Sequence, residues 1–349
     1  FIDGGVCASK GFRANGIQCG LAHKPLNDTD ENSANAMPAK KKNDLALIVA
    51  DKECTASAVY TTNKVKGAPI LVTKEHIKNG KAKAIIVNSV NANTCNADGV
   101  QKAEKMCSLV ADEMGLNVDD VIVASTGVIG QILPIEPIAN GMKELVSGLT
   151  YDGNSRAVEA IMTTDTQVKE VAVQFELGGK TCTMGGMLKG SGMIHPNMAT
   201  TLTFITTDVD ISAELLQKAL SDVVKITLNR VSVDGDTSTN DMVCVLANGT
   251  AENIPVTKEN QDFEKFVNAL YAVMMNLARK MARDGEGATK LIECVCHGAD
   301  DDKTAEIVAK SVITSSLFKA AMFGEDANWG RILCAVGYAD ADFDINKVD

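Results

Sequence analysis

The sequence lacks any uninterrupted apolar run of about 18 residues, the length that a helix needs to cross a lipid bilayer. Its first residues, 1–5, have neither the basic nor the apolar region of a secretory signal peptide. Because the first residue is Phe rather than Met, residues 1–5 do not show whether a targeting segment stood before them. We therefore expect a globular protein that acts in the cytoplasm and has no membrane partner.

A surplus of positive charge is also missing. Lys and Arg total 34 against 45 for Asp and Glu, which gives a formal net charge of −11. Proteins that bind nucleic acid neutralise its phosphates with a concentrated basic surface. The short basic run at 40–42 lies in a polar segment, 25–42, and is typical of a solvated loop. We therefore expect no nucleic-acid partner.

Metal-binding patterns are absent as well. The ten cysteines are scattered without a Cys-x-x-Cys pair, and the four histidines do not cluster. Cys294 and Cys296 would share one face of a strand, but no further Cys or His stands at zinc-ligand spacing from them. We expect reduced, mostly buried thiols and no bound metal.

Nucleotide-binding signatures are missing too. Gly178-Gly179-Lys180-Thr181 resembles the end of a phosphate-binding loop, but Gln174 stands where that loop has its first glycine. No Gly-x-Gly-x-x-Gly follows an expected strand, and no Gly-x-Ser-x-Gly indicates a hydrolase triad. We therefore expect no nucleotide cofactor.

The chain does contain clear strand and helix patterns. Short apolar runs bounded by turn-forming residues predict strands at 45–50, 84–88 and 121–125. Apolar residues at helical spacing predict helices over about 98–114 and 259–283. With 349 residues, 45% of them hydrophobic, the chain can form one large domain and a smaller one.

The expected domain boundary lies near residue 285. The long predicted helix ends there in a glycine-rich segment, and a new strand is expected to begin at Lys290. Aspartates at 300–302 favour the start of a helix over about 302–319. We expect a main domain over 1–284 and a smaller domain over 285–349.

The most informative stretch runs from Lys189 to Asp208, where a glycine-rich loop meets an expected strand. If the peptide bond between Ala199 and Thr200 breaks, Thr200 becomes an N-terminus. Its α-amine, with a pKa near ~8, can then act as the base for its own hydroxyl. The same residue types also fit an ordinary core strand whose threonines pair across a sheet.

Ser125-Thr126-Gly127 ends another expected strand with a hydroxyl followed by a glycine. A side-chain O–H and a backbone N–H directed at one point form an oxyanion hole, whose preorganised donors contribute about 3–4 kcal/mol. The alternative is a plain glycine-rich turn between a strand and a loop.

Two more polar segments are candidates for substrate binding. Thr163 begins a Thr-Thr-Asp block after a helix-like stretch, and its alternative role is to cap the next element. Glu286 stands between two glycines and can project into a cleft, although a glycine C-cap with charged flanks explains it equally. Lys189 could pair with a substrate carboxylate in a partly dry pocket.

These blocks resemble, in order and spacing, the motifs of the ornithine acetyltransferase family. Residues 197–200, Asn-Met-Ala-Thr, match its maturation site, and 125–130 match its Ser-Thr-Gly-Val-Ile-Gly motif. Residues 283–290 match its Arg-Asp-Gly-Glu-Gly-Ala-Thr-Lys segment. The resemblance covers essentially the whole chain, from residues 4–6 to 328–331.

The resemblance implies a fold and a maturation step. The implied fold is α/β, with stacked mixed β-sheets flanked by helices as in N-terminal-nucleophile hydrolases, and a smaller α/β second domain. Self-cleavage between Ala199 and Thr200 would give an α chain, 1–199, and a β chain, 200–349. In the family these chains stay associated, commonly as an α2β2 heterotetramer.

The resemblance also implies the reaction, a glutamate N-acetyltransferase step of arginine biosynthesis. Thr200 would attack the acetyl group of N-acetylornithine while Thr126 and Gly127 stabilise the oxyanion. Ornithine would leave, and glutamate would take the acetyl group from Thr200 in a ping-pong cycle. No cofactor takes part in this cycle.

The family's substrate-binding residues correspond to Thr163, Lys189, Thr200 and Glu286. Glu286 would bind the substrate ammonium or relay protons to and from the leaving and attacking amines. Three other functions stay open: a bifunctional form that also uses acetyl-CoA, an N-terminal-nucleophile hydrolase in which water accepts the acyl group, and an uncleaved pseudoenzyme that binds amino acids or partners.

Two of the sequence's departures from the family pattern concern backbone strain and contacts with the substrate. Val90 stands where the family usually has glycine, and a positive φ at that position would strain a β-branched residue. The family pattern also continues beyond the equivalent of Asp349 into a tail whose asparagine and hydroxyl residue contact the substrate, and nothing in this sequence matches that tail.

Overall fold

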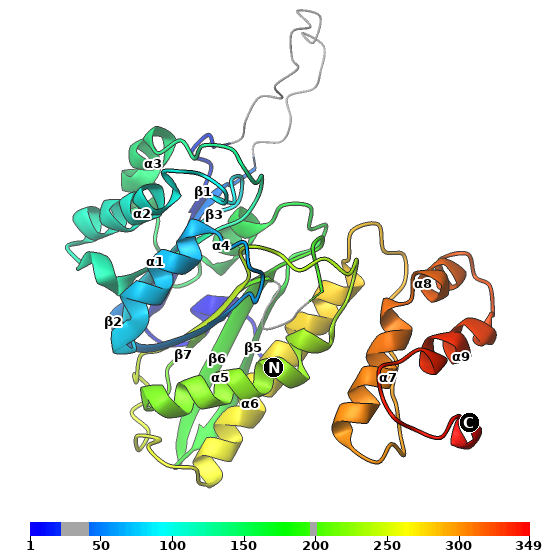
Figure 1. The fold of residues 1–349 in the computed structure, drawn as a ribbon. Helices are drawn as coiled ribbons and strands as arrows, with labels where there is room; N and C mark the ends of the chain where they lie inside the picture. The colour runs from blue at the N-terminus through cyan, green and yellow to red at the C-terminus, as the bar shows by residue number, and fades with distance from the viewer. Residues whose placement is uncertain (22–41, 196–200) are drawn as a thin grey trace, which may run out of the picture.

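The computed structural model describes residues 1–21, 42–195 and 201–349. At its centre lies an eight-stranded sheet in the order β4-β3-β2-β8-β7-β6-β5, with β1 paired to β2 outside this path (Figure 1). The pairs β3–β4 and β7–β8 are parallel and the other pairs are antiparallel. The strands are β1 (Phe12–Ile17), β2 (Leu45–Tyr60), β3 (Lys81–Asn88), β4 (Val121–Ser125), β5 (Glu170–Leu177), β6 (Lys180–Lys189), β7 (Leu202–Thr207) and β8 (Met242–Ala247).

The long strand β2 folds the sheet into two layers. Its register shifts between Val49 and Cys54, so that its first part pairs with β1 and β3 and its last part with β8. Such an irregularity bends a strand and increases its twist. Side chains from β1, β2 and β3 then share one core with side chains from β6, β7 and β8. The two halves of the sheet therefore stack face to face.

Helices cover the outer faces of both layers. Helices α5 and α6 pack on the half with β5 to β8, and α1, α2 and α3 pack on the half with β3 and β4 (Figure 1). The expected architecture of stacked mixed sheets flanked by helices is thus confirmed. The helices are α1 (Ala68–His76), α2 (Gly99–Met114), α3 (Glu136–Ser147), α4 (Asn154–Ile161), α5 (Ala213–Ile226), α6 (Gln261–Arg283), α7 (Asp302–Thr314), α8 (Ser316–Phe323) and α9 (Trp329–Gly337).

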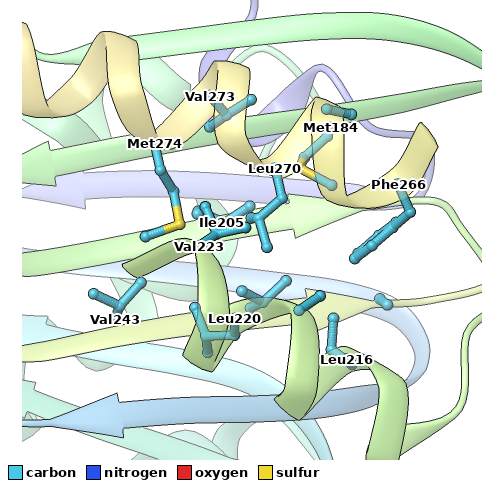
Figure 2. Close-up of a cluster of buried hydrophobic side chains, with 14 of the residues drawn as sticks. Met184, Ile205, Leu216, Leu220, Val223, Val243, Phe266, Leu270, Val273 and Met274 are labelled. Carbon is cyan, nitrogen blue, oxygen red and sulfur yellow. The ribbon is translucent and has the colours of Figure 1, made fainter. Parts of the chain in front are cut away.

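The core beneath α6 follows the helical spacing seen in the sequence. Phe266, Leu270 and Val273 are fully buried on one face of α6 and meet Leu220 of α5 and Ile205 of β7 (Figure 2). The helix begins after Asn260, whose side chain accepts a hydrogen bond from the third residue on. The helix predicted over 259–283 is confirmed.

The other periodic segments also form the predicted elements. The strands at 45–50, 84–88 and 121–125 are parts of β2, β3 and β4, and the helix over 98–114 is α2. Residues 178–179, both with positive φ, form the tight turn that joins β5 to β6. No helix in the described part of the chain is long and apolar enough to span a bilayer.

Residues 285–349 differ from the expectation. All of them are described and none lies in a strand, so the strand predicted to begin at Lys290 is wrong. Residues 291–297 do alternate in burial, and Ile292 and Cys294 pack against a small cluster around Val312 and Phe318. Strand-like alternation alone does not form a strand, and no strand in the described part of the chain accepts the backbone hydrogen bonds of this segment.

This C-terminal part has its own small apolar cluster, which agrees with a boundary near residue 285. The helix predicted over 302–319 is divided in two. Asp301 caps α7 as expected, but Ser315 lies in an extended conformation and caps a second helix, α8. In Figure 1, α7, α8 and α9 lie together beside the C-terminal end of α6 and away from the sheet. The division into domains at 284 stays a prediction.

Replacing Leu270 by alanine should destabilise the protein by about 2–5 kcal/mol, because a fully buried leucine on α6 leaves a cavity. Urea unfolding of the two proteins measures the difference. The matched control is Leu71→Ala on α1, where the leucine is 49% exposed, and it should change stability by less than about 0.5 kcal/mol. Equal effects of the two changes would contradict the core described here.

Candidate active site

A small cavity of about 20 Å³ lies where the two layers of the sheet approach one another. It is bordered by residues that follow β4 and β6 and by residues that precede or begin β7 and β8. Its volume is about that of one bound water. The lining residues are Thr126, Lys189, Gly190, Gly192, Met193, Ile194, Thr201, Leu202, Ser238, Asn240 and Asp241.

The turn after β4 brings Thr126 into this cavity. The Thr126 N–H donates to the Asn88 carbonyl at 3.0 Å, and the Val128 N–H donates to the Val90 carbonyl at 3.0 Å. Gly127 between them has a φ of +127°, and a Cβ there would lie 2.1 Å from the Val90 carbonyl oxygen. Only glycine fits this position. Among the described residues, neither the Gly127 N–H nor the Thr126 hydroxyl has a hydrogen-bond partner, so both are available to a ligand.

Buried amides hold this turn in place. The Asn240 side chain, 6% exposed, donates to the Ser125 carbonyl at 2.8 Å and to the Ala92 carbonyl at 2.6 Å. Asn88 donates to the Ser125 hydroxyl at 2.6 Å. Because Asn240 precedes β8 while Ser125 ends β4, these bonds tie the two layers together at the cavity.

The strain considered for Val90 does not occur. Val90 is not among the described residues with positive φ, and its N–H donates to the Asn88 side chain at 3.3 Å. Val90 instead restricts the residue that it contacts. Position 127 must be glycine, because any side chain there would collide with the Val90 carbonyl. The hypothesis of a strained Val90 is therefore wrong for this structure.

A buried ion cluster lies beside the cavity. Lys169 is 1% exposed and its ammonium donates to Asp165 at 2.6 Å and to Asp284 at 2.5 Å. Asp165 also accepts the Gly190 N–H at 2.9 Å, and Asp284 accepts the Thr166 hydroxyl. One lysine thus connects the loop after α4, the loop after β6 and the end of α6.

The cluster keeps both carboxyls ionised. Burial opposes ionisation of Asp165, but attraction to the Lys169 ammonium and their hydrogen bond hold the pKa of Asp165 below its usual value. Burial acts in the same direction on Asp284, and hydrogen bonds from Lys169 and Thr166 lower the pKa of that carboxyl overall.

Thr163 is positioned by the same cluster but does not line the cavity. Its N–H donates to Asp165 at 3.0 Å, and its carbonyl accepts the Lys42 ammonium at 2.9 Å. Burial lowers the pKa of Lys42 against the opposing attraction of Asp165. Thr163 is therefore linked to the cavity through Asp165 and Gly190 rather than by direct contact.

Glu286 stands on the outer side of the loop that follows β6. Its N–H donates to the Ser191 carbonyl at 2.9 Å, and a Cβ at Gly192 would lie 2.3 Å from its carboxylate. The side chain is exposed and lines a second cavity, of about 650 Å³, between α6 and residues 286–323. Glu286 is thus close to the loop that borders the small cavity but belongs to the larger space.

Lys189 and Asp241 are the ionisable groups that line the small cavity. Burial lowers the pKa of the Lys189 ammonium, although Asp165 and Asp241 oppose this shift. Burial raises the pKa of Asp241 well above that of an ordinary carboxyl, against hydrogen bonds from Ser238 and the charge of Lys189. Both groups are therefore shifted toward their neutral forms.

The predicted cleavage residues, Ala199 and Thr200, lie outside the described residues. The residue bonded to Thr200, Thr201, lines the small cavity and is 4% exposed. Its carbonyl accepts the Met242 N–H at 2.8 Å, which continues the pairing of β7 with β8. The structure thus brings Thr126, Lys189 and Thr201 to one cavity, with Gly127 next to it.

Sequence reasoning missed the groups that support these residues. Asn240 and Asp241 end the polar run 234–241 directly before an apolar strand, and that position at a strand start is the signal that could have found them. Lys169 had no such signal, because a lysine between two elements reads as a surface residue.

Comparison with known proteins gives the following matches. A model of the ArgJ family matches residues 31–349. The arginine biosynthesis bifunctional protein ArgJ of Caldanaerobacter subterraneus is 46% identical over 349 residues, which cover 100% of this chain and 82% of that protein. ArgJ 1 of Clostridium acetobutylicum is 49% identical over 317 residues, covering 90% of this chain and 78% of its own.

Among solved structures, the ornithine acetyltransferase of Mycobacterium tuberculosis in complex with ornithine is similar to this chain. The two are 32% identical, with a TM-score of 0.48. The match covers 56% of this chain and 96% of the other.

Replacing Lys169 by methionine should destabilise the protein by about 3–5 kcal/mol at neutral pH, since two buried carboxylates lose their partner. In the wild type, both carboxyls have lowered pKa values, so their stabilisation is present above about pH 4 and is lost as the pH falls through the folded-state values. In the variant the two carboxyls can bind protons instead. The loss in free energy of unfolding relative to the wild type should therefore shrink between pH 7 and about pH 4.

Urea unfolding at several pH values measures this deficit. The matched control is Lys81→Met, which removes an exposed partner of Glu53 and should leave the unfolding midpoint unchanged. A deficit in Lys169→Met that is absent at neutral pH, or that does not change with pH, would contradict the ion cluster as its source.

Proposed function

The chain belongs to the ArgJ family, and we propose that it moves an acetyl group from N-acetylornithine to glutamate through an acetyl-Thr200 intermediate. The chain is an acyltransferase of arginine biosynthesis, the pathway that the names of its relatives give. We place this reaction in the cytoplasm.

The observation that carries the proposal is the convergence of Thr126, Lys189 and Thr201 on one buried cavity. Acyl transfer needs a nucleophile, donors for the developing oxyanion and a site for the substrate's charged group. The Thr126 hydroxyl and Gly127 N–H have no hydrogen-bond partner in the described parts of the chain, and Thr126 lines the cavity with Thr201, the residue that follows Thr200. Preorganised donors of this kind stabilise a tetrahedral oxyanion without reorganising during the reaction.

Cleavage between Ala199 and Thr200 would create the nucleophile and its base in one residue. The Thr200 hydroxyl attacks the acetyl carbonyl and passes its proton to the new α-amine. The amide C–N bond then breaks, and ornithine leaves with the ester on Thr200. In the second half, the glutamate amine attacks this ester and Thr200 recovers its hydroxyl proton. The products of maturation are chains 1–199 and 200–349, which we propose remain together as α2β2.

Charged groups at two levels would bind the amino-acid parts of the substrates. Lys189 lines the cavity and can pair with a carboxylate. Glu286 is exposed beside the loop 190–192 and can bind an ammonium group there. Thr163 supports this arrangement through Asp165. No cofactor is needed for the cycle.

A second candidate adds acetyl-CoA as acetyl donor, because the relatives are named bifunctional. Both donors would acylate the same threonine. A steady-state assay of acetyl-CoA with glutamate, in the absence of N-acetylornithine, distinguishes the two forms.

Purified protein should consist of two fragments, one of which begins at Thr200, as measured by intact mass and N-terminal sequencing. Thr200→Ala should remain a single chain, because it lacks the hydroxyl that attacks its own peptide bond. The cleaved protein should make N-acetylglutamate only when glutamate is present. Acetate release without glutamate would indicate a hydrolase, and an intact wild-type chain would indicate a pseudoenzyme.

Thr126→Val should lower kcat by about 100–1,000-fold with little change in KM, because it removes one donor to the oxyanion and keeps the side-chain shape. Initial rates over a range of N-acetylornithine concentrations separate the two constants. Thr181→Val, at an exposed position near the start of β6, is the control and should have wild-type kinetics. A rise in KM alone would assign Thr126 to substrate binding instead.

A further inference from the structure

Asp241 is a buried carboxyl that faces the small cavity. It is 3% exposed and directly precedes β8, and it lines the cavity with Thr126, Lys189 and Thr201. Its Oδ2 atom makes no hydrogen bond to any described residue. Buried polar atoms are nearly always hydrogen-bonded, so an exception at a cavity wall indicates a function for that oxygen.

The surroundings of Asp241 hold it rigidly. Its carbonyl accepts the Thr61 N–H at 3.0 Å, and the next residue, Met242, donates to the Thr201 carbonyl at 2.8 Å. Hydrogen bonding from Ser238 and the charge of Lys189 oppose the raised pKa of this carboxyl, and Lys189 is the charged group that acts on it among the described residues. Asp241 is therefore fixed by backbone bonds on the strand that pairs with the one following Thr200.

Burial gives this carboxyl the properties of a proton donor. It raises the pKa of Asp241 well above the ordinary range, which favours the protonated form of the side chain. Glu286 differs, because it is exposed and faces the larger space. An exposed carboxylate suits the binding of an ammonium group, whereas a buried carboxylic acid suits proton transfer.

We propose that Asp241 is the acid–base residue that serves the substrate amine in acetyl transfer, while the α-amine of Thr200 serves only the Thr200 hydroxyl. This inference rests on the proposed function. It assigns to Asp241 the proton relay for which Glu286 is the other candidate.

The protons balance over the cycle. In the first half, the Thr200 O–C bond forms and its proton moves to the α-amine. The C–N bond of N-acetylornithine breaks, and its nitrogen takes the proton of Asp241, which becomes a carboxylate. In the second half, the neutral glutamate amine forms the new N–C bond and gives a proton back to Asp241. The ester C–O bond breaks, and the α-ammonium returns its proton to the Thr200 oxygen.

Asp241→Asn tests this role with two acetyl donors. N-acetylornithine needs a proton on its leaving nitrogen, whereas p-nitrophenyl acetate releases a stable anion that needs none. We expect the variant to be acetylated by N-acetylornithine at least ~100-fold more slowly than the wild type, and by p-nitrophenyl acetate at a rate within about threefold. Mass spectrometry of the fragment that begins at Thr200 measures both rates.

The matched control is Asp208→Asn. Asp208 is also fully buried with an oxygen that has no partner among the described residues, and burial also raises the pKa of that carboxyl. It lies at the opposite end of β7, about 20 Å from the cavity at the usual rise per residue. Its rates with both donors should match the wild type.

Two results would overturn the role of Asp241. Equal slowing with both donors would make it a structural residue, and no slowing with N-acetylornithine would leave the relay to another group. A wild-type protein that takes acetyl from neither donor would instead overturn the proposed function itself.

If Asp241→Asn is not cleaved, the wild type supplies the test through its pH profile. At saturating donor, the rate with N-acetylornithine should fall as the pH rises through the pKa of Asp241, and the rate with p-nitrophenyl acetate should not. Titration of the α-amine affects both donors alike, and Lys189 is the other charged group that faces Asp241 among the described residues. Parallel profiles for the two donors would contradict the proposal.

Discussion

The site depends most on the buried ammonium of Lys169. This ammonium connects three segments far apart in sequence: the loop after α4, the loop after β6 and the end of α6. The ammonium pairs with Asp165 and Asp284, and these carboxylates in turn bind backbone N–H groups at Gly190 and Thr166. Burying three charges is tolerated only because each is paired and the remaining lone pairs of the two carboxylates accept hydrogen bonds. The geometry of Lys189 and Glu286 follows from this arrangement.

The turn after β4, which holds Thr126 and Gly127, depends on a different constraint, the close approach of two backbone segments. Gly127 lies against the Val90 carbonyl at a distance that no side chain permits. This contact, with the bonds that Asn240 donates across the layers, leaves the Gly127 N–H without a partner among the described residues. A donor that is kept unpaired by rigid surroundings stabilises developing charge at little entropic cost. Folding of the sheet at β2 is what brings Asn240 over the end of β4.

Local patterns predicted the elements well, and long-range contacts decided what they missed. Strands such as 121–125 and the helix ending at Arg283 follow from periodicity that acts within a few residues. The pattern at 291–297 was equally strand-like, yet a strand requires a partner that sequence does not provide. The site residues Thr126 and Lys189 could be named through resemblance. Lys169 and Asn240 could not, because their importance arises from partners more than 100 residues away.

The burial of Asp241 also bears on the base that cleavage would create. In the proposed reaction, an ionised Asp241 would favour the ammonium form of the Thr200 α-amine and so reduce the fraction of neutral amine able to take the hydroxyl proton. A protonated Asp241 avoids this, since a neutral acid exerts no such attraction. Once the proposed transfer has moved both protons, the carboxylate and the ammonium carry opposite charges, and their attraction would stabilise the acyl-enzyme while the ester persists. The same burial that raises the pKa of Asp241 thus favours a reactive amine before attack and a stable acyl-enzyme after it.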